Sequence, residues 1–171
     1  QVGLPSGVDG NSEVGHISMG AGKILFQDLP RIDNAIKNKS FFDNPVIKQA
    51  FEHARQNKGN VHVMGLVGNG KVHASVDHLM ALIEMAKIEK MDPDSLFIHA
   101  FTDGRDSASD AATKVLQRIE NECLRLRMGR VASIMGRYYA MDRDRRWDRT
   151  QAAYDLLTKG EGNIVVDRDK Y

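Results

Sequence analysis

The segment LFIHAFTDGRD, at residues 96–106, joins an apolar run to a polar turn. The run LFIHAFT at 96–102 predicts a buried β-strand, and the DGRD at 103–106 predicts a turn directly after it. Two further runs have the same form, VHVMGLV at 61–67 and RVASIMG at 130–136. The sequence therefore predicts three short strands that each lead into a polar loop. NIVV, at 163–166, predicts the start of a fourth strand.

Helical segments alternate with these strands. Apolar residues recur at helical spacing over 75–90, and helices are also predicted over 110–129 and between residue 146 and Gly160. Glycines at 129 and 160 are expected to end the last two helices. Strand, helix and strand in alternation predict an α/β fold with a mostly parallel sheet flanked by helices.

The first part of the chain has a different composition. Residues 1–10 are rich in glycine and predict a loop, followed by a helix from Asn11 or Ser12 to the glycines at 20–22. Two more helices are expected, one with Asp28 as its cap and one with Asn44 as its cap, Pro45 in the first position and Gly59 at its end. The composition changes near residue 26, so we expect one unit over 1–26 and another over 27–171.

The overall composition excludes several classes of protein. Of the 171 residues, 42% are hydrophobic and 27% charged, which is typical of a globular fold. A formal net charge of +1 argues against a general nucleic-acid or membrane-surface binder. The single cysteine, Cys123, excludes an internal disulfide and favours a reducing compartment such as the cytoplasm. No apolar run is long enough to span a bilayer, and the chain, which starts without methionine, is expected to be a piece of a longer protein.

Polar residues gather in the loops that follow the three predicted strands. These loops are GNGKVH at 68–73, DGRD at 103–106 and GRYYAMDRDRRW at 136–147. Ligands of open parallel sheets bind beyond the carboxyl ends of the strands, so the loops are expected to converge on one crevice. Arginine binds phosphate or carboxylate through a planar fork of donors. The loops therefore predict a site for a small anion; the alternative is a solvated surface on which Asp and Arg side chains pair with each other.

The remaining polar residues permit simpler interpretations. Asp103 is either a helix-start or turn residue, or part of the site, while Asp106 either orients Arg105 or binds a ligand hydroxyl. Two strand histidines, His62 and His99, are expected in the core. Cys123 is expected to be inert packing. His73 and His78 are five residues apart, which suggests no shared metal.

Ser12, in the segment GNSEVGH at 10–16, is either a helix cap or a nucleophile. A serine hydroxyl reacts at neutral pH only when a base or a metal activates it. His16 lies four residues further on and is one candidate base. The start of a helix also attracts anions, because its free N–H groups and dipole favour negative charge.

Four phrases together resemble the family of cofactor-independent, or 2,3-bisphosphoglycerate-independent, phosphoglycerate mutases. They are GLPSGVDGNSEVGH at 3–16, VHASVDHL at 72–79, IHAFTDGRD at 98–106 and GRYYAMDRDRRWDR at 136–149. The resemblance implies a monomeric, two-domain enzyme of the alkaline-phosphatase superfamily, about three times longer than this chain. Residues 1–26 would then belong to the metal-binding phosphatase-like domain, and 27–171 to part of the phosphotransferase domain. Such an enzyme interconverts 3-phosphoglycerate and 2-phosphoglycerate through a phosphoserine, using two divalent metals, typically Mn²⁺.

The resemblance also implies roles for single residues. Ser12 would be the nucleophile and a ligand of one metal, which makes His16 a weaker candidate for its base. Ser75 stands where many relatives have a second histidine, so it carries no assigned role. Substrate would be bound by five residues: His73, Arg105, Asp106, Arg137 and Arg143.

Without the other metal ligands, the chain alone is expected to have little or no mutase activity. The alternatives are a non-catalytic α/β module that binds a small phosphorylated acid, and a related phosphomutase acting on a sugar phosphate. DGRD together with RYYAMDR argues against the sugar phosphate.

Overall fold

A computed structural model describes residues 3–4, 12–108 and 110–164 of the chain. Contacts between Cα atoms divide it into two compact units, Gln1–Lys48 and Gln49–Tyr171, which are considered separately below. This division into compact units does not test the boundary expected near residue 26, so the assignment of 1–26 and 27–171 to two domains stays a prediction.

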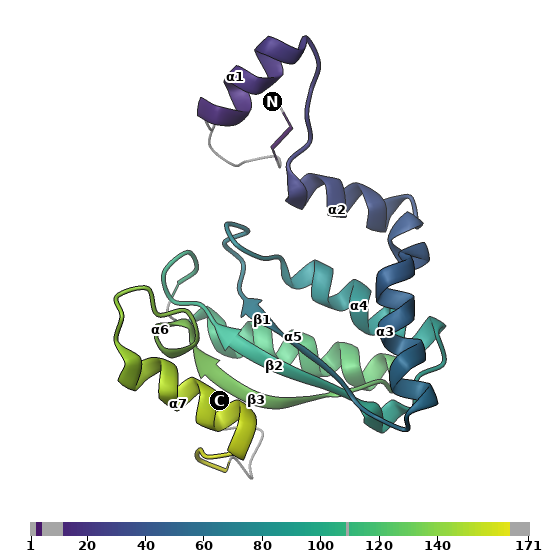
Figure 1. The fold of residues 1–171 in the computed structure, drawn as a ribbon, viewed down its shortest axis with the longest axis vertical. Helices are drawn as coiled ribbons and strands as arrows, with labels where there is room; N and C mark the ends of the chain where they lie inside the picture. Colours follow the sequence, from purple (N-terminus) through teal and green to yellow (C-terminus); the bar gives the residue numbers. More distant parts are fainter. Residues whose placement is uncertain (1–2, 5–11, 109, 165–171) are drawn as a thin grey trace. The chain divides into compact units, whose positions relative to one another are not determined.

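A three-stranded parallel sheet forms the centre of the second unit. Its strands are β1 (Val61–Val67), β2 (Leu96–Thr102) and β3 (Arg130–Gly136), in the order β1-β2-β3 (Figure 1). These bounds confirm the three predicted strands. Val67 pairs with Thr102, and Thr102 pairs with Gly136, so the carboxyl ends of all three strands lie level with each other.

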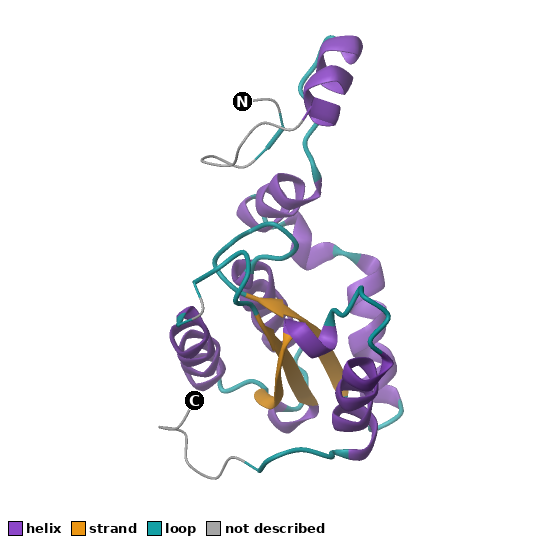
Figure 2. Cartoon of the chain, turned by 90° about the vertical axis from the view of Figure 1, so that its left-hand side faces the viewer, coloured by secondary structure: helices purple, strands orange, loops and turns teal. Residues whose placement is uncertain are grey.

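Helices flank this sheet, as the alternating pattern predicts (Figure 2). The connections contain α4 (Val76–Ile88), a 3₁₀ turn η2 (Pro93–Ser95), α5 (Ala111–Leu126), the short α6 (Arg137–Ala140) and α7 (Trp147–Lys159). Helix α4 packs beside α5, and α7 packs along β3. The fold is therefore α/β, with a parallel sheet and flanking helices. Residues 163–164 form no strand, and the rest of the expected fourth strand lies outside the described residues.

The core of this unit follows from the helical spacing of apolar residues. In α5, Val115, Ile119 and Cys123 recur every four residues and are all buried. They face the sheet side of the molecule together with the fully buried Ile83 of α4 and Ile98 of β2. Burial raises the pKa of the Cys123 thiol to about 11, which agrees with its predicted role as inert packing.

The first unit contains α1 (Ser12–Ala21), α2 (Asp28–Lys37) and a 3₁₀ turn η1 (Ser40–Asp43). Helix α1 ends before Gly22, whose φ of 64° is left-handed, as expected for the glycines at 20–22. Helix α3 (Pro45–Gln56) spans the division between the units. Its predicted start is confirmed, because the Asn44 side chain accepts hydrogen bonds from the backbone N–H groups of Val46 and Ile47.

Three predicted helix ends are wrong in detail. Helix α2 begins at Asp28 itself, and the cap position is Gln27. Helices α3 and α5 end three residues before Gly59 and Gly129, at Gln56 and Leu126. In both cases a basic residue takes the left-handed conformation, at φ 50° for Lys58 and for Arg127. The glycine therefore follows the turn instead of making it.

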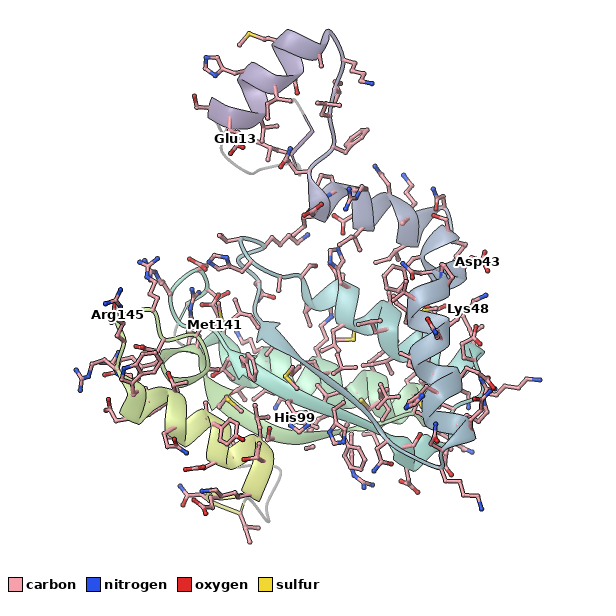
Figure 3. All side chains as sticks on the ribbon, in the orientation of Figure 1. Glu13, Asp43, Lys48, His99, Met141 and Arg145 are labelled. Atoms are coloured by element: carbon pink, nitrogen blue, oxygen red, sulfur yellow. The ribbon has the colours of Figure 1, made fainter. Side chains whose placement is uncertain are left out.

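The two strand histidines differ in burial. His99 on the central strand is buried, as predicted, but His62 is exposed because β1 is an edge strand of the sheet. A chain of hydrogen bonds crosses the sheet at His99, which Figure 3 labels. His62 Nδ1 lies 2.9 Å from His99 Nε2, and His99 Nδ1 lies 2.7 Å from Ser133 Oγ. Burial, and then the nearby charge of His62, lower the pKa of His99 below its usual range.

No helix in the described part of the chain combines the length and apolar character that a membrane span requires.

Candidate functional site

Asp103 organises the loop that follows β2. Its Oδ1 atom accepts hydrogen bonds from the backbone N–H groups of Gly104, Arg105 and Asp106, at 2.8, 3.0 and 3.1 Å. The side chain of Asp103 is only 3% exposed, and its hydrogen bonds to three backbone N–H groups stabilise the turn of the DGRD segment. Both earlier interpretations of Asp103 hold, since it is a turn residue and also lies in the candidate site.

Arg137, the first residue after β3, links this loop to the next. Its Nη1 atom donates to Asp103 Oδ1 at 2.9 Å and to Asp106 Oδ2 at 2.7 Å. These hydrogen bonds, first from Asp106 and then from Asp103, raise the pKa of Arg137 above its ordinary value. Burial alone would raise the pKa of Asp103, but the backbone N–H groups and the Arg137 guanidinium outweigh it and hold that pKa well below its usual range. Asp103 and Arg137 are therefore both charged at neutral pH.

The loop that follows β1 lies in close contact with the DGRD loop. A Cβ atom on Gly70 would stand 2.3 Å from the backbone oxygen of Asp106, so only glycine fits there without a shift. The same loop leads to His73, whose Nε2 atom lies 3.7 Å from Asp106 Oδ2. His73 is half exposed. Ser75, next in this segment, is the N-cap of α4 and accepts from the backbone N–H of Asp77 at 3.3 Å.

The third loop, which contains Met141 and Arg145, is fixed at its base (Figure 3). Arg149 of α7 lies 3.3 Å from Asp142 Oδ1, and these side chains are only 15% and 3% exposed. The Arg149 guanidinium also lies 3.7 Å from the ring centroid of Tyr138. These contacts hold the ends of the loop while Arg143, between them, stays exposed.

The three loops enclose one cleft of about 770 Å³ at the carboxyl ends of the strands. Figure 1 shows the loops after β1, β2 and β3 at the same end of the sheet. All five residues that the sequence assigned to substrate line this cleft: His73, Arg105, Asp106, Arg137 and Arg143. Their proximity agrees with the predicted convergence, whereas their roles in binding remain predictions.

The charges of the cleft divide into paired and available groups. Arg137 and Arg149 pair with aspartates. For these two residues the structure agrees with the alternative interpretation, in which Asp and Arg side chains pair with each other. Among the residues that the structure describes, the guanidinium groups of Arg105 and Arg143 have no hydrogen-bond or ion-pair partner. Two arginines are therefore available to an anionic ligand, beside a scaffold of charges that neutralise each other.

Sequence reasoning missed the scaffold. Asp142, Arg149 and Tyr138 all line the cleft, yet none was given a role, although Asp142 and Tyr138 lie in the predicted third loop. The spacing of Asp142 and Arg149 across the start of a predicted helix was the available signal, because it allows a helix residue to reach back to the loop before it.

Ser12 belongs to the first unit and is the first residue of α1, with an exposed side chain. Its Oγ atom lies 3.3 Å from His16 Nδ1, and the same nitrogen lies 2.6 Å from the Ser12 carbonyl oxygen. A protonated Nδ1 donates to that carbonyl and then has no lone pair to accept the serine proton. This geometry disfavours His16 as the base for Ser12.

The described residues contain no group of three or more His, Cys, Asp or Glu side chains placed to hold a metal ion. Ser12 as a metal ligand therefore remains a prediction that depends on groups beyond those described.

A family model described as "BPG-independent PGAM N-terminus" matches residues 32–170. The chain is 51% identical over 162 residues to a 2,3-bisphosphoglycerate-independent phosphoglycerate mutase of Moorella thermoacetica, and 50% identical over 166 residues to one of Serratia proteamaculans. It covers 31% and 32% of those two proteins, which in turn match 95% and 97% of this chain. The fold is similar to a crystal structure of Leishmania mexicana phosphoglycerate mutase at low cobalt concentration. That likeness has a TM-score of 0.77 and 28% identity over 95% of this chain and 30% of the other.

Proposed function

Since the chain belongs to the family of 2,3-bisphosphoglycerate-independent phosphoglycerate mutases, we propose that it forms part of an enzyme that interconverts 3-phosphoglycerate and 2-phosphoglycerate. The chain spans about a third of the length of the curated relatives it matches. Its share of the task is to bind and orient the substrate in the cleft and to supply Ser12 as the phosphate acceptor.

One observation supports this proposal most strongly: two arginines, on separate loops and without a partner in the described part of the chain, line one cleft with His73, Asp106 and Arg137. Phosphoglycerate carries a phosphate, a carboxylate and a free hydroxyl. Arg105 and Arg143 suit the two anionic groups, because each guanidinium offers a fork of donors.

The partly paired residues suit the remainder of the ligand. Asp106 keeps one carboxylate oxygen, Oδ1, free to accept the hydroxyl of glycerate, since its Oδ2 already binds Arg137. Arg137 uses only Nη1 in its contacts with aspartates and retains Nε and Nη2 as donors. His73 also lines the cleft, and we propose that it donates to an oxygen of the phosphate.

Ser12 is proposed to take the phosphate. Its hydroxyl gives up a proton as Oγ forms a bond to phosphorus, the bond from phosphorus to the substrate oxygen breaks, and that oxygen takes up a proton to become a hydroxyl. The glycerate then turns, and its other hydroxyl takes the phosphate back as the bond to Ser12 breaks. Most of the acceleration in such transfers comes from positioning and from neutralising charge.

The family is metal-dependent, and we propose two divalent ions, with Mn²⁺ as the metal. Such ions supply positive charge that favours the alkoxide form of serine. Ser12 has an exposed hydroxyl oxygen that could bind a divalent cation, but the described residues contain no group of three or more His, Cys, Asp or Glu side chains placed to hold one. The remaining ligands would come from other parts of the protein. The proposal includes a monomer in the cytoplasm that binds neither nucleic acid nor membrane.

A chimera tests this proposal. The chain would replace the matching segment of a longer relative, and mutase activity would be assayed with Mn²⁺ and 3-phosphoglycerate. We expect activity in the chimera, none with Ser12→Ala, and phosphorylated Ser12 in the active protein by mass spectrometry. His16→Gln is the matched control: it should retain most activity, because His16 Nδ1 is occupied by the Ser12 carbonyl. A folded chimera that binds 3-phosphoglycerate but never phosphorylates Ser12 would contradict the proposal.

The chain alone should show little or no turnover in the same assay, and turnover comparable to that of a complete enzyme would contradict this. A non-catalytic binding module is the second candidate, and the available arginines of the cleft favour it equally. The chimera separates the two, because a module predicts binding without phosphorylation of Ser12.

A further inference from the structure

The hydroxyl of Ser107 connects the loops of the cleft. Its Oγ atom accepts hydrogen bonds from the backbone N–H groups of Asn69 at 2.9 Å and Gly70 at 3.1 Å. It also donates to Asp103 Oδ2 at 3.1 Å. One side chain thus joins the loop after β1 to the carboxylate that organises the loop after β2.

The backbones of these loops approach each other closely at this point. A Cβ atom on Gly68 would stand 2.8 Å from Ser107 Oγ and 2.9 Å from Asp103 Cβ, and one on Gly70 would meet the Asp106 backbone at 2.3 Å. Glycine removes the steric barrier to this contact but supplies no attraction. The Ser107 hydroxyl supplies it, because it is the acceptor that both N–H groups have among the residues that the structure describes.

Asp103 extends the connection to the third loop. Its two oxygens have different partners. Oδ2 accepts a hydrogen bond from Ser107, while Oδ1 accepts from Arg137 and from the backbone of its own turn. A change at Ser107 therefore acts on two sides, on the loop that carries His73 and on the aspartate that holds Arg137.

We propose that Ser107 is a positioning residue of the cleft, which holds the 68–73 loop against the DGRD loop and so sets the place of His73 beside Asp106. Ser107 does not line the cleft itself, so it acts through its neighbours and not on the ligand. The inference rests on the proposed function for the identity of the ligand, phosphoglycerate, but not for the connection between the loops.

Threonine should replace serine here. The side chain of Ser107 lies beside Val67, Ala111 and Val115, so the methyl group that threonine adds would meet apolar neighbours. The hydroxyl that makes all three hydrogen bonds is retained in S107T and lost in S107A. The pair of variants separates the hydroxyl from the general effect of any substitution at this position.

Two measurements on the 171-residue chain test the proposal. The first is backbone amide hydrogen exchange by NMR, which follows Asn69 and Gly70 individually. We expect both amides to exchange about tenfold faster or more in S107A than in the unsubstituted chain, and at nearly unchanged rates in S107T. Ser95→Ala is the matched control, because Ser95 also donates a hydrogen bond, to the Asp92 carbonyl, but at the other end of β2.

The second measurement is the affinity for 3-phosphoglycerate by calorimetry. We expect S107A to bind about tenfold more weakly, and S107T and S95A to bind as the unsubstituted chain does. If the unsubstituted chain does not bind 3-phosphoglycerate at all, the proposed function fails while amide exchange still decides the role of Ser107.

Unchanged exchange at Asn69 and Gly70 in S107A would overturn the inference. So would equal acceleration in S107A and S107T, or an acceleration spread evenly over the whole chain, which indicates general destabilisation. If S107A does not fold, S107C takes its place under the same criteria, because a thiol has a similar shape but is a weak acceptor.

Discussion

Replacing Asp103 by asparagine tests how the cleft is held together. The amide keeps one oxygen to accept from the backbone N–H groups of Gly104, Arg105 and Asp106. It removes the charge that faces Arg137, and its NH₂ group cannot accept the hydrogen bond that Ser107 donates. D103N therefore keeps the backbone hydrogen bonds of the turn but loses the negative charge that pairs with Arg137.

The expected cost follows from the contacts that remain. Removing one partner of a buried ion pair costs about 3–5 kcal/mol when the other charge is left alone. Arg137 is not left alone, because Asp106 Oδ2 still accepts from it at 2.7 Å. We therefore expect D103N to lose about 2 kcal/mol of unfolding free energy, roughly a thirtyfold change in the folding equilibrium. D103A also loses the acceptor of three backbone N–H groups and should lose about 4 kcal/mol.

The pH dependence gives a second, independent expectation. The pKa of Asp103 in the folded chain lies below its ordinary value of 3.8. A depressed carboxyl pKa contributes stability that is fully present above the unfolded value and is lost as the pH falls through the folded one. The gap in stability between the unsubstituted chain and D103N should therefore narrow in acid, below about pH 4.

Urea unfolding followed by far-UV circular dichroism, at pH 7 and in acid, measures both quantities. Trp147 is 72% exposed and would be a poor fluorescent probe. Asp94→Asn is the matched control, because Asp94 also pairs with an arginine, Arg130, but is 87% exposed, so its loss should cost less than about 1 kcal/mol. If D103N matches the control at pH 7, or if its deficit does not narrow in acid, the account of Asp103 is refuted.

Three further predictions concern other parts of the second unit. Gly70→Ala should weaken 3-phosphoglycerate binding measured by calorimetry, because its Cβ would meet the Asp106 backbone. Gly65→Ala on β1 serves as control, because its Cβ has open space and Gly65 does not line the cleft; equal effects would contradict this. The pKa of His99 is lowered from 6.5, so its contribution to stability is lost as the pH falls below that value. In His99→Gln the free energy of unfolding in urea should therefore depend less on pH between about pH 7 and 5; an unchanged pH dependence would contradict this. Cys123, 6% exposed with a pKa raised to about 11, should react with a thiol reagent only after unfolding, and rapid labelling of the folded chain would show that its burial is overstated.

Much of the fold follows from local patterns. The three strands occupy the predicted residues because each is a short apolar run bounded by glycine or polar residues, a signal that depends on few neighbours. Level carboxyl ends of parallel strands then bring the loops together, which is why His73, Arg105 and Arg143 were predicted in one place.

Features that depend on contacts between distant segments were not predictable in this way. The burial of His99 and the exposure of His62 depend on which strand lies at the edge, and the sequence does not state the strand order. The left-handed turns at Lys58 and Arg127 occur where glycine stood nearby and was the better local candidate.

The scaffold of the cleft was missed for the same reason. Asp142 and Arg149 pair across a loop and a helix, and the carboxylate of Asp103 meets Arg137 from a neighbouring strand. In a run of Asp and Arg residues, the sequence alone does not say which aspartate pairs with which arginine. The pairs depend on how the folded backbone brings these side chains together.

The central claim is that three strand-end loops form one pocket for a phosphorylated three-carbon acid, and NMR titration of the ¹⁵N-labelled chain with 3-phosphoglycerate tests it most directly. The account predicts saturable shifts confined to the loops at 68–73, 103–107 and 136–146, which disappear in a double variant with Arg105→Met and Arg143→Met but persist in Arg125→Met. Shifts scattered over the surface, or shifts that survive the loss of Arg105 and Arg143, would contradict it.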